Sequence, residues 1–218
     1  MSLKIDLEDF PISQELIEDA IDVLTARVIQ RYPNGCTICG ILVGALPIVQ
    51  RMQDIFAKQN PHLYPTCFIG ARSYVDNKQK DAVGIYSLPS SHLFSKKNVV
   101  LVDDVIDTGN TAKAVARVLG ERFKAKEVNI IALCVKGDMP PWVSPEAVGF
   151  ELPKDQFIIG YGMDYNGEYR DLKEIRPITE AERAATPAIP AKTVEPVVEE
   201  VRHGDTGLDS DGDQPRQV

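Results

Sequence analysis

Apolar positions along the chain recur at two spacings, which predict alternating helices and strands. Residues 13–31 carry apolar side chains at helical spacing, and Pro33-Asn34-Gly35 ends that pattern. Further helices are predicted at residues 47–59 and 111–123. Apolar runs predict strands at residues 36–45, 66–74, 98–103 and 127–135, and the first is continuous enough to be buried on both faces. Because strands alternate with helices, we expect an α/β fold with a mostly parallel twisted sheet flanked by helices.

Two segments depart from this alternation, and the chain changes character near its end. Residues 75–95 are polar and poorly patterned, which is typical of a lid or binding loop. Residues 149–152 and 156–160 predict shorter strands that belong to a small hood subdomain.

Residues beyond 178 contain recurring prolines, many acidic residues and no aromatic residue. Such a segment buries too little surface to offset its ordering entropy. We therefore expect one domain over residues 1–178 and an acidic, Pro-containing, disordered tail over residues 179–218. The alternative is an interaction tail, or a simple metal chelator around Asp209, Asp211 and Asp213.

Charge and length narrow the classes of partner. The formal net charge of −8 argues against a protein that coats nucleic acid, although a local nest of donors still suffices for a small phosphorylated ligand. The N-terminus has no apolar run of signal-peptide length, and no stretch approaches a membrane span. We therefore expect a cytoplasmic protein with no membrane partner.

The four cysteines include the pair Cys36 and Cys39, spaced as in redox and zinc sites. A four-ligand zinc site needs a second pair or histidines at ligand spacing, and the sequence has neither. The pair instead lies in an apolar segment, so we interpret these thiols as small core residues and expect no disulfide.

The stretch VVLVDDVIDTGNT, residues 99–111, contains the candidate residues for ligand binding. Ligands of parallel α/β sheets collect beyond the carboxyl ends of the strands, where Asp103, Asp104 and Asp107 are expected. Residues 107–111 then turn from strand into helix, and the backbone N–H groups there, with the Thr108 and Thr111 hydroxyls, suit one phosphate. The stretch lacks the GxxxxGK[ST] pattern of nucleotide-triphosphate loops.

One phosphate beside adjacent carboxylates suggests a sugar phosphate whose hydroxyls lie on Asp103 and Asp104. The alternative is that these residues only form a turn and that Asp107 only begins the helix.

The same stretch resembles the phosphoribosyl-pyrophosphate signature of the type I phosphoribosyltransferases. FIIGYGMDYNGEYRDL, residues 157–172, resembles the C-terminal signature of the hypoxanthine-guanine phosphoribosyltransferases, and LCVKGDMP, VGFELP and ARSYVDN are also similar to that family. The resemblance covers most of residues 10–178. It implies the type I phosphoribosyltransferase fold and a purine salvage enzyme that transfers 5-phosphoribose from phosphoribosyl pyrophosphate to hypoxanthine or guanine. It also implies magnesium as the cofactor and a homo-oligomer, either a dimer or a tetramer.

The resemblance assigns roles to the sugar-phosphate residues. Asp103 and Asp104 would hold the ribose hydroxyls, partly through magnesium, and Asp107 would face N7 of the purine as the general acid or base. The 5′-phosphate would bind the loop residues Thr108, Gly109, Asn110 and Thr111.

It likewise assigns the purine, pyrophosphate and loop contacts. Lys136 would donate to O6 of the base, Phe157 would stack on it, and the Ile158 backbone would meet its 2-position. Pyrophosphate would contact Arg170, a second magnesium on Asp164, and the turn containing Val43 and Gly44. The closing loop would begin at Arg72, Ser73 and Tyr74.

Several alternatives stay open. Lys136 could be a solvated lysine, Phe157 a packing residue, and Arg170 a surface partner of Asp171 or Glu168. Tyr161, Tyr165 and Tyr169 are interpreted as structural.

One position departs from the family pattern, because Val43 stands where the pyrophosphate turn usually carries a basic residue. The backbone N–H groups of that turn can still bind phosphate. The departure leaves room for a nucleotide-sensing regulator on the same fold, and an enzyme acting on xanthine or a pyrimidine is a third possibility.

Overall fold

The computed structural model describes residues 2–60, 62–73 and 83–187. A seven-stranded sheet with the order β1-β7-β6-β5-β2-β3-β4 forms its centre, and every neighbouring pair is parallel except β3 and β4. The strands are β1 (Leu3–Lys4), β2 (Thr37–Leu42), β3 (Thr66–Ser73), β4 (Val83–Ser87), β5 (Asn98–Ile106), β6 (Glu127–Lys136) and β7 (Val148–Leu152). The predicted fold class is confirmed.

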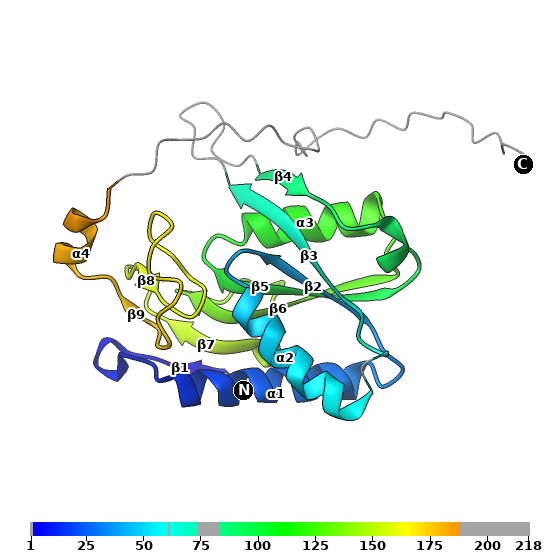
Figure 1. Cartoon of the computed structure of the whole chain (residues 1–218), viewed down its shortest axis with the longest axis horizontal. Helices are drawn as coiled ribbons and strands as arrows, with labels where there is room; N and C mark the ends of the chain where they lie inside the picture. Colours follow the sequence, from blue (N-terminus) through cyan, green and yellow to red (C-terminus); the bar gives the residue numbers. More distant parts are fainter. Residues whose placement is uncertain (1, 61, 74–82, 188–218) are drawn as a thin grey trace, which may run out of the picture.

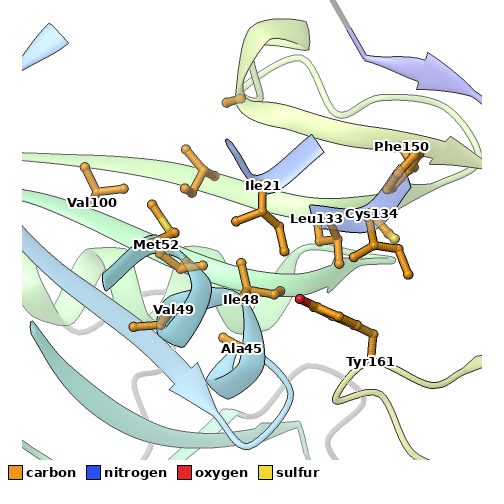
Figure 2. Close-up of a cluster of buried hydrophobic side chains, with 14 of the residues drawn as sticks. Ile21, Ala45, Ile48, Val49, Met52, Val100, Leu133, Cys134, Phe150 and Tyr161 are labelled. Carbon is orange, nitrogen blue, oxygen red and sulfur yellow. The ribbon is translucent and has the colours of Figure 1, made fainter. Parts of the chain in front are cut away.

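Helices cover both faces of this sheet (Figure 1). Helices α1 (Gln14–Arg31) and α2 (Leu46–Gln59) share one hydrophobic core with the hood, whereas α3 (Asn110–Glu121) packs with β2, β3 and β4 in a second core. Figure 2 shows the first core, where Ile21 of α1 and Ile48 and Met52 of α2 meet Leu133 and Phe150 of the sheet. Tyr161 enters this core from the hood and is 8% exposed, which confirms its structural role.

Local signals explain where these helices begin and end. Helix α1 begins after Ser13, whose hydroxyl accepts a hydrogen bond from the Leu16 N–H at 3.3 Å. It ends before Gly35, which has a φ of +94°, and a Cβ there would lie 2.3 Å from the Leu63 carbonyl oxygen.

All four cysteines are buried and free, as expected.

The hood (residues 157–178) contains the antiparallel pair β8 (Ile158–Ile159) and β9 (Arg176–Pro177). Residues 149–152, which were predicted to belong to it, instead lie in β7 of the central sheet beside β6, so that part of the prediction is wrong. It stands beside the carboxyl end of β7 (Figure 1). A Cβ on Gly162 would lie 2.3 Å from the Gly44 carbonyl oxygen, so the loop of the hood rests directly on the turn after β2. The hood therefore faces the carboxyl ends of the parallel strands.

Strand β5 runs further than its apolar pattern predicts. It was expected to end at Asp103 but continues to Ile106, because β6 extends beside it and pairs Val105 with Cys134 and Ile106 with Val135. Asp103 and Asp104 therefore lie within the strand, and Asp107 alone of the three aspartates lies beyond it. The predicted end of the strand at Asp103 is therefore three residues too early.

Two other predicted irregular segments contain regular structure. Strand β4 and a short 3-10 helix at Ser91–Leu93 lie within residues 75–95, which were predicted to form one loop. Helix α4 (Glu180–Ala185) lies within the segment predicted to be disordered, so that prediction is wrong for residues 179–187. Residues 188–218, including Asp209, Asp211 and Asp213, lie outside the described residues.

Candidate active site

A cleft with a volume of about 270 Å³ lies where the sheet meets the hood. Strands β2, β3, β4 and β5, helix α3 and the hood all contribute to its wall. Its lining residues are Ile41, Leu42, Val43, Gly44, Ala71, Tyr86, Asp103, Asp104, Val105, Thr111, Asp164 and Arg170. Residues predicted from separate parts of the sequence to bind phosphoribosyl pyrophosphate thus meet in one cleft.

Asp103, which is buried, and Asp104, which is half-buried, form a carboxylate pair on β5. Asp103 is 6% exposed, and its Oδ1 accepts a hydrogen bond from the Asp104 N–H at 3.1 Å. The Asp104 Oδ1 accepts one from the Val105 N–H at 2.9 Å. Burial raises the pKa of both carboxyls, and the neighbouring negative charge of Asp104 raises that of Asp103 further. Two negative charges this close together favour the binding of a cation, or of a ligand with hydroxyl donors, in the cleft.

The turn after β2 approaches this pair through its backbone. A Cβ on Gly44 would lie 1.7 Å from the Asp104 Oδ2, so only glycine permits this approach. The Leu42–Val43 peptide bond is cis, and Val43 is 46% exposed at the cleft wall. The valine places no positive charge there.

Arg170 supplies positive charge from the hood. Its Nη2 lies 2.7 Å from the Asp164 Oδ1, and its Nη1 donates to the Gly162 carbonyl oxygen at 2.6 Å. The Asp164 Oδ2 accepts a hydrogen bond from the Gly167 N–H at 2.7 Å. The charge of Arg170 also opposes the rise in the pKa of Asp104. The alternative that Arg170 pairs with Asp171 or Glu168 is therefore wrong.

Asp107 and Lys136 form an ion pair across the ends of two neighbouring strands. The Lys136 Nζ lies 3.0 Å from the Asp107 Oδ2, because β5 and β6 are in register at Ile106 and Val135, Asp107 directly follows β5 and Lys136 is the last residue of β6. The side chain of Lys136 is 12% exposed, whereas that of Asp107 is 57% exposed. The alternative of a solvated lysine is wrong.

The predicted phosphate loop has the expected backbone form. Gly109 caps α3 with a φ of +76°, a conformation that favours glycine, and the Thr108 hydroxyl accepts a hydrogen bond from the Asn110 N–H at 3.4 Å. Thr111, in the first turn of α3, lines the cleft. The loop thus presents the start of a helix toward the carboxylate pair.

Phe157 and Ile158 are not among the residues that line this cleft. Ile158 lies buried in β8, and Phe157 immediately before it is 39% exposed. The Phe157 ring meets that of Tyr165 edge to face, with ring centroids 5.2 Å apart.

The proposed loop residues are only partly described. Arg72 and Ser73 belong to β3, where they pair with Gly84 and Val83 of β4. Tyr74 lies outside the described residues. The loop assignment stays a prediction.

Three aromatic or basic residues near these groups were missed by the sequence argument. Tyr86 of β4 lines the cleft and packs on Gly70, Trp142 lies against Gly109, and Arg183 of α4 lies over the Phe157 ring. Only α4 left a signal in the sequence, because Thr179 and Glu182 have the spacing of a capping box. The other two approach through non-local packing.

A family model of the phosphoribosyl transferase domain matches residues 12–166. The chain belongs to the phosphoribosyltransferase family. Hypoxanthine-guanine phosphoribosyltransferase from Bos taurus is 34% identical over 188 residues, which cover 82% of this chain and 84% of the relative. The corresponding relative from Cricetulus griseus is 34% identical over 118 residues, or 54% of this chain, and the match spans about half (53%) of that relative.

A solved structure gives the same result. The crystal structure of a hypoxanthine phosphoribosyltransferase from Staphylococcus aureus has a TM-score of 0.64 and 26% identity, over 78% of this chain and 90% of that chain. These comparisons confirm the predicted phosphoribosyltransferase fold. The family match ends at residue 166, before Arg170 and α4.

Proposed function

We propose that this phosphoribosyltransferase transfers 5-phosphoribose from phosphoribosyl pyrophosphate to hypoxanthine or guanine, giving IMP or GMP and pyrophosphate. The observation that carries the proposal is the ion pair of Asp107 and Lys136, with 3.0 Å between Oδ2 and Nζ. A 6-oxopurine presents N7 and O6 side by side on one edge, as guanine does in the major groove of DNA. The lysine donates to O6 while the carboxylate meets N7. The names of the two relatives support both bases, and that of the solved structure supports hypoxanthine.

The sugar phosphate fits the groups around this pair. The loop at residues 107–111 offers backbone N–H groups for the 5′-phosphate, and Asp103 and Asp104 accept hydrogen bonds from the ribose hydroxyls. The pyrophosphate lies between Arg170 and the turn at Gly44, where a positive charge and backbone donors oppose its negative charge. Phe157 stacks on the base and the Ile158 backbone meets its 2-position.

The donor set fits magnesium. Asp103 and Asp104 are adjacent carboxylates on the cleft, Asp164 of the hood is a third carboxylate that lines it, and magnesium prefers one or two carboxylates with substrate oxygens and water. Among the described residues, no three His, Cys, Asp or Glu side chains converge as a complete site. Substrate oxygens and water would complete the set of ligands. When bound, magnesium would neutralise charge on the pyrophosphate.

The chain's own residues then account for the remaining steps. The purine N9 forms the bond to C1′ of the ribose as the bond from C1′ to pyrophosphate breaks. The proton on N7 passes to the Asp107 carboxylate, which acts as the general base. Arg170 opposes the charge on the leaving pyrophosphate. A closed loop beginning at Arg72, Ser73 and Tyr74 would keep water away from the sugar cation that develops.

The assembly and compartment stay predictions. The resemblance implies a dimer or a tetramer, which sedimentation would test. In the portion of the chain that the structure describes, no helix has the length and apolar character needed to span a bilayer. A cytoplasmic location stays an expectation from the sequence.

Pyrophosphate release tests the proposal directly. The purified chain is incubated with magnesium, phosphoribosyl pyrophosphate and one free base at a time: hypoxanthine, guanine, xanthine, adenine or uracil. We expect turnover with hypoxanthine or guanine, and a loss of at least about 100-fold in kcat for Asp107→Asn, which keeps the size but not the carboxylate. Nucleotide binding without turnover by the parent would instead support the regulator. Turnover with uracil or xanthine alone would overturn the choice of base.

A further inference from the structure

Helix α4 is held on the hood by three side-chain contacts at its two ends. The Arg176 Nη2 and Nη1 donate to the two carboxylate oxygens of Glu182 at 2.7 and 2.9 Å. At the other end, the Thr186 hydroxyl lies 3.0 Å from the Tyr169 hydroxyl. Thr186, the residue after the helix, is 9% exposed, whereas α4 itself contains no buried residue, so its attachment to the hood depends on these end contacts.

This docking places Arg183 in the corner between two perpendicular rings. The Arg183 Cζ lies 5.4 Å from the centroid of Phe157 and 5.8 Å from that of Tyr165. The two rings themselves meet at 84°. A cation over one face of Phe157, with Tyr165 against the ring, restricts the orientation of Phe157.

Helix α4 stands apart from the carboxylates of the proposed site. Helix α4 lies beyond β8 and β9, on the side away from β5 (Figure 1). The carboxylates and the ion pair of the proposed site lie at the end of β5. Phe157 is 39% exposed, so the contact with Arg183 leaves part of its ring accessible to a planar ligand.

We propose that Arg183 is a positioning residue for the purine: with Tyr165 it holds the Phe157 ring as the platform on which the base stacks. The inference rests on the proposed function and adds α4, beyond the matched family range, to the base pocket. A Phe157 ring whose orientation is already fixed binds the base more tightly, because less conformational entropy is lost when the base stacks on it. The sugar phosphate, which contacts other elements, gains nothing from it.

The test is steady-state kinetics of Arg183→Ala with the base and phosphoribosyl pyrophosphate varied in turn. We expect the KM for hypoxanthine to rise about two- to five-fold, as loss of an exposed cation–π contact implies, while the KM for phosphoribosyl pyrophosphate stays within error. Arg183→Lys, which keeps the cation, should restore part of the loss. Glu182→Gln, which weakens the docking of α4 by another route, should raise the KM for the base in the same direction.

Arg122→Ala is the matched control, because the Arg122 Cζ lies 5.9 Å over the Phe123 ring after α3, away from the proposed site. Its KM for hypoxanthine should equal that of the parent. An active parent whose KM for hypoxanthine is unchanged or lowered in Arg183→Ala would overturn the inference, and a lowered KM would show that Arg183 occupies the place of the base. Equal rises in both KM values would also overturn it. An inactive parent would instead refute the proposed function.

Discussion

The Gly44 Cα faces the Asp104 carboxylate so closely that a Cβ on Gly44 would lie 1.7 Å from Oδ2. The turn after β2 and the acidic strand β5 are therefore fitted to each other at the cleft. A side chain at position 44 must push the carboxylate away from its place on the wall. The contact thus links the backbone donors of the turn to the position of Asp104.

Gly44→Ala should accordingly impair the binding of phosphoribosyl pyrophosphate. We expect a rise of at least about ten-fold in its KM, since a buried polar group left without its partners costs about 1–3 kcal/mol. Steady-state kinetics with varied phosphoribosyl pyrophosphate measure the effect. Gly120→Ala is the control: its Cβ would meet nothing within 4 Å in α3, so it should stabilise the fold by about 0.5–1 kcal/mol and leave KM unchanged. A parental KM in Gly44→Ala would contradict this.

When no magnesium or substrate is bound, the repulsion between the Asp103 and Asp104 carboxylates should lower the stability of the fold. Asp103→Asn removes one of two like charges from a residue that is 6% exposed and keeps an oxygen to accept the Asp104 N–H. We expect the free energy of unfolding at pH 7, without magnesium or substrate, to rise by about 0.5–2 kcal/mol while turnover falls. Urea unfolding of both proteins measures this. A less stable Asp103→Asn would show that the carboxylate contributes to folding.

Trp142 should report on the phosphate loop. It is the single tryptophan of the chain, and a Cβ on Gly109 would lie 2.3 Å from its Cζ2. Ligand binding at residues 107–111 should therefore change its emission, with saturation at the affinity for phosphoribosyl pyrophosphate. Free ribose, which lacks the phosphate, should cause no change. If Thr108→Ala binds as tightly and gives the same signal, the phosphate lies elsewhere.

The docking of α4 should weaken in acid. Hydrogen bonds lower the pKa of Glu182 from 4.5 to about 2. The largest effect comes from Arg176, and smaller ones come from the Thr179 N–H and hydroxyl. Because the pKa is lowered in the folded state, the stabilisation is fully present above pH 4.5 and is lost as the pH falls toward 2. The parent should therefore exceed Glu182→Gln in thermal midpoint above pH 4.5, and the difference should shrink toward pH 2. A difference that is constant over this range would exclude the Glu182 carboxylate as its source.

Most of the residues of the site were predictable from the sequence, whereas the strands that form the walls of the cleft were not all predicted with their full extent. Asp103, Asp104 and Thr111 meet in the cleft as expected, because a strand followed by a phosphate turn is encoded in consecutive residues, and Arg170, which the family resemblance implied, joins them from the hood. The extension of β5 depends on β6 beside it, and strand β4 depends on pairing with β3. Both partner strands were predicted from the sequence, but how strands pair is not visible in a local pattern.

The prediction of disorder was wrong at helix α4 for a different reason. Its acidic, Pro-containing surroundings favoured disorder, but the capping box at Thr179 and Glu182 and the contact to Arg176 order it. The placement of Arg183 over Phe157 follows from that docking, which composition does not reveal.

Competition between two bases tests the central claim most directly. Hypoxanthine and adenine at equal concentration share limiting phosphoribosyl pyrophosphate, and the ratio of the two nucleotides formed gives the ratio of kcat/KM. Lys136 donates and cannot accept, so the amine of adenine would face it without a hydrogen bond, at a cost of about 1–3 kcal/mol. We predict that IMP exceeds AMP by roughly ten- to a hundred-fold and that Lys136→Ala reduces this ratio. Equal amounts of the two nucleotides, or no nucleotide at all, would contradict the account.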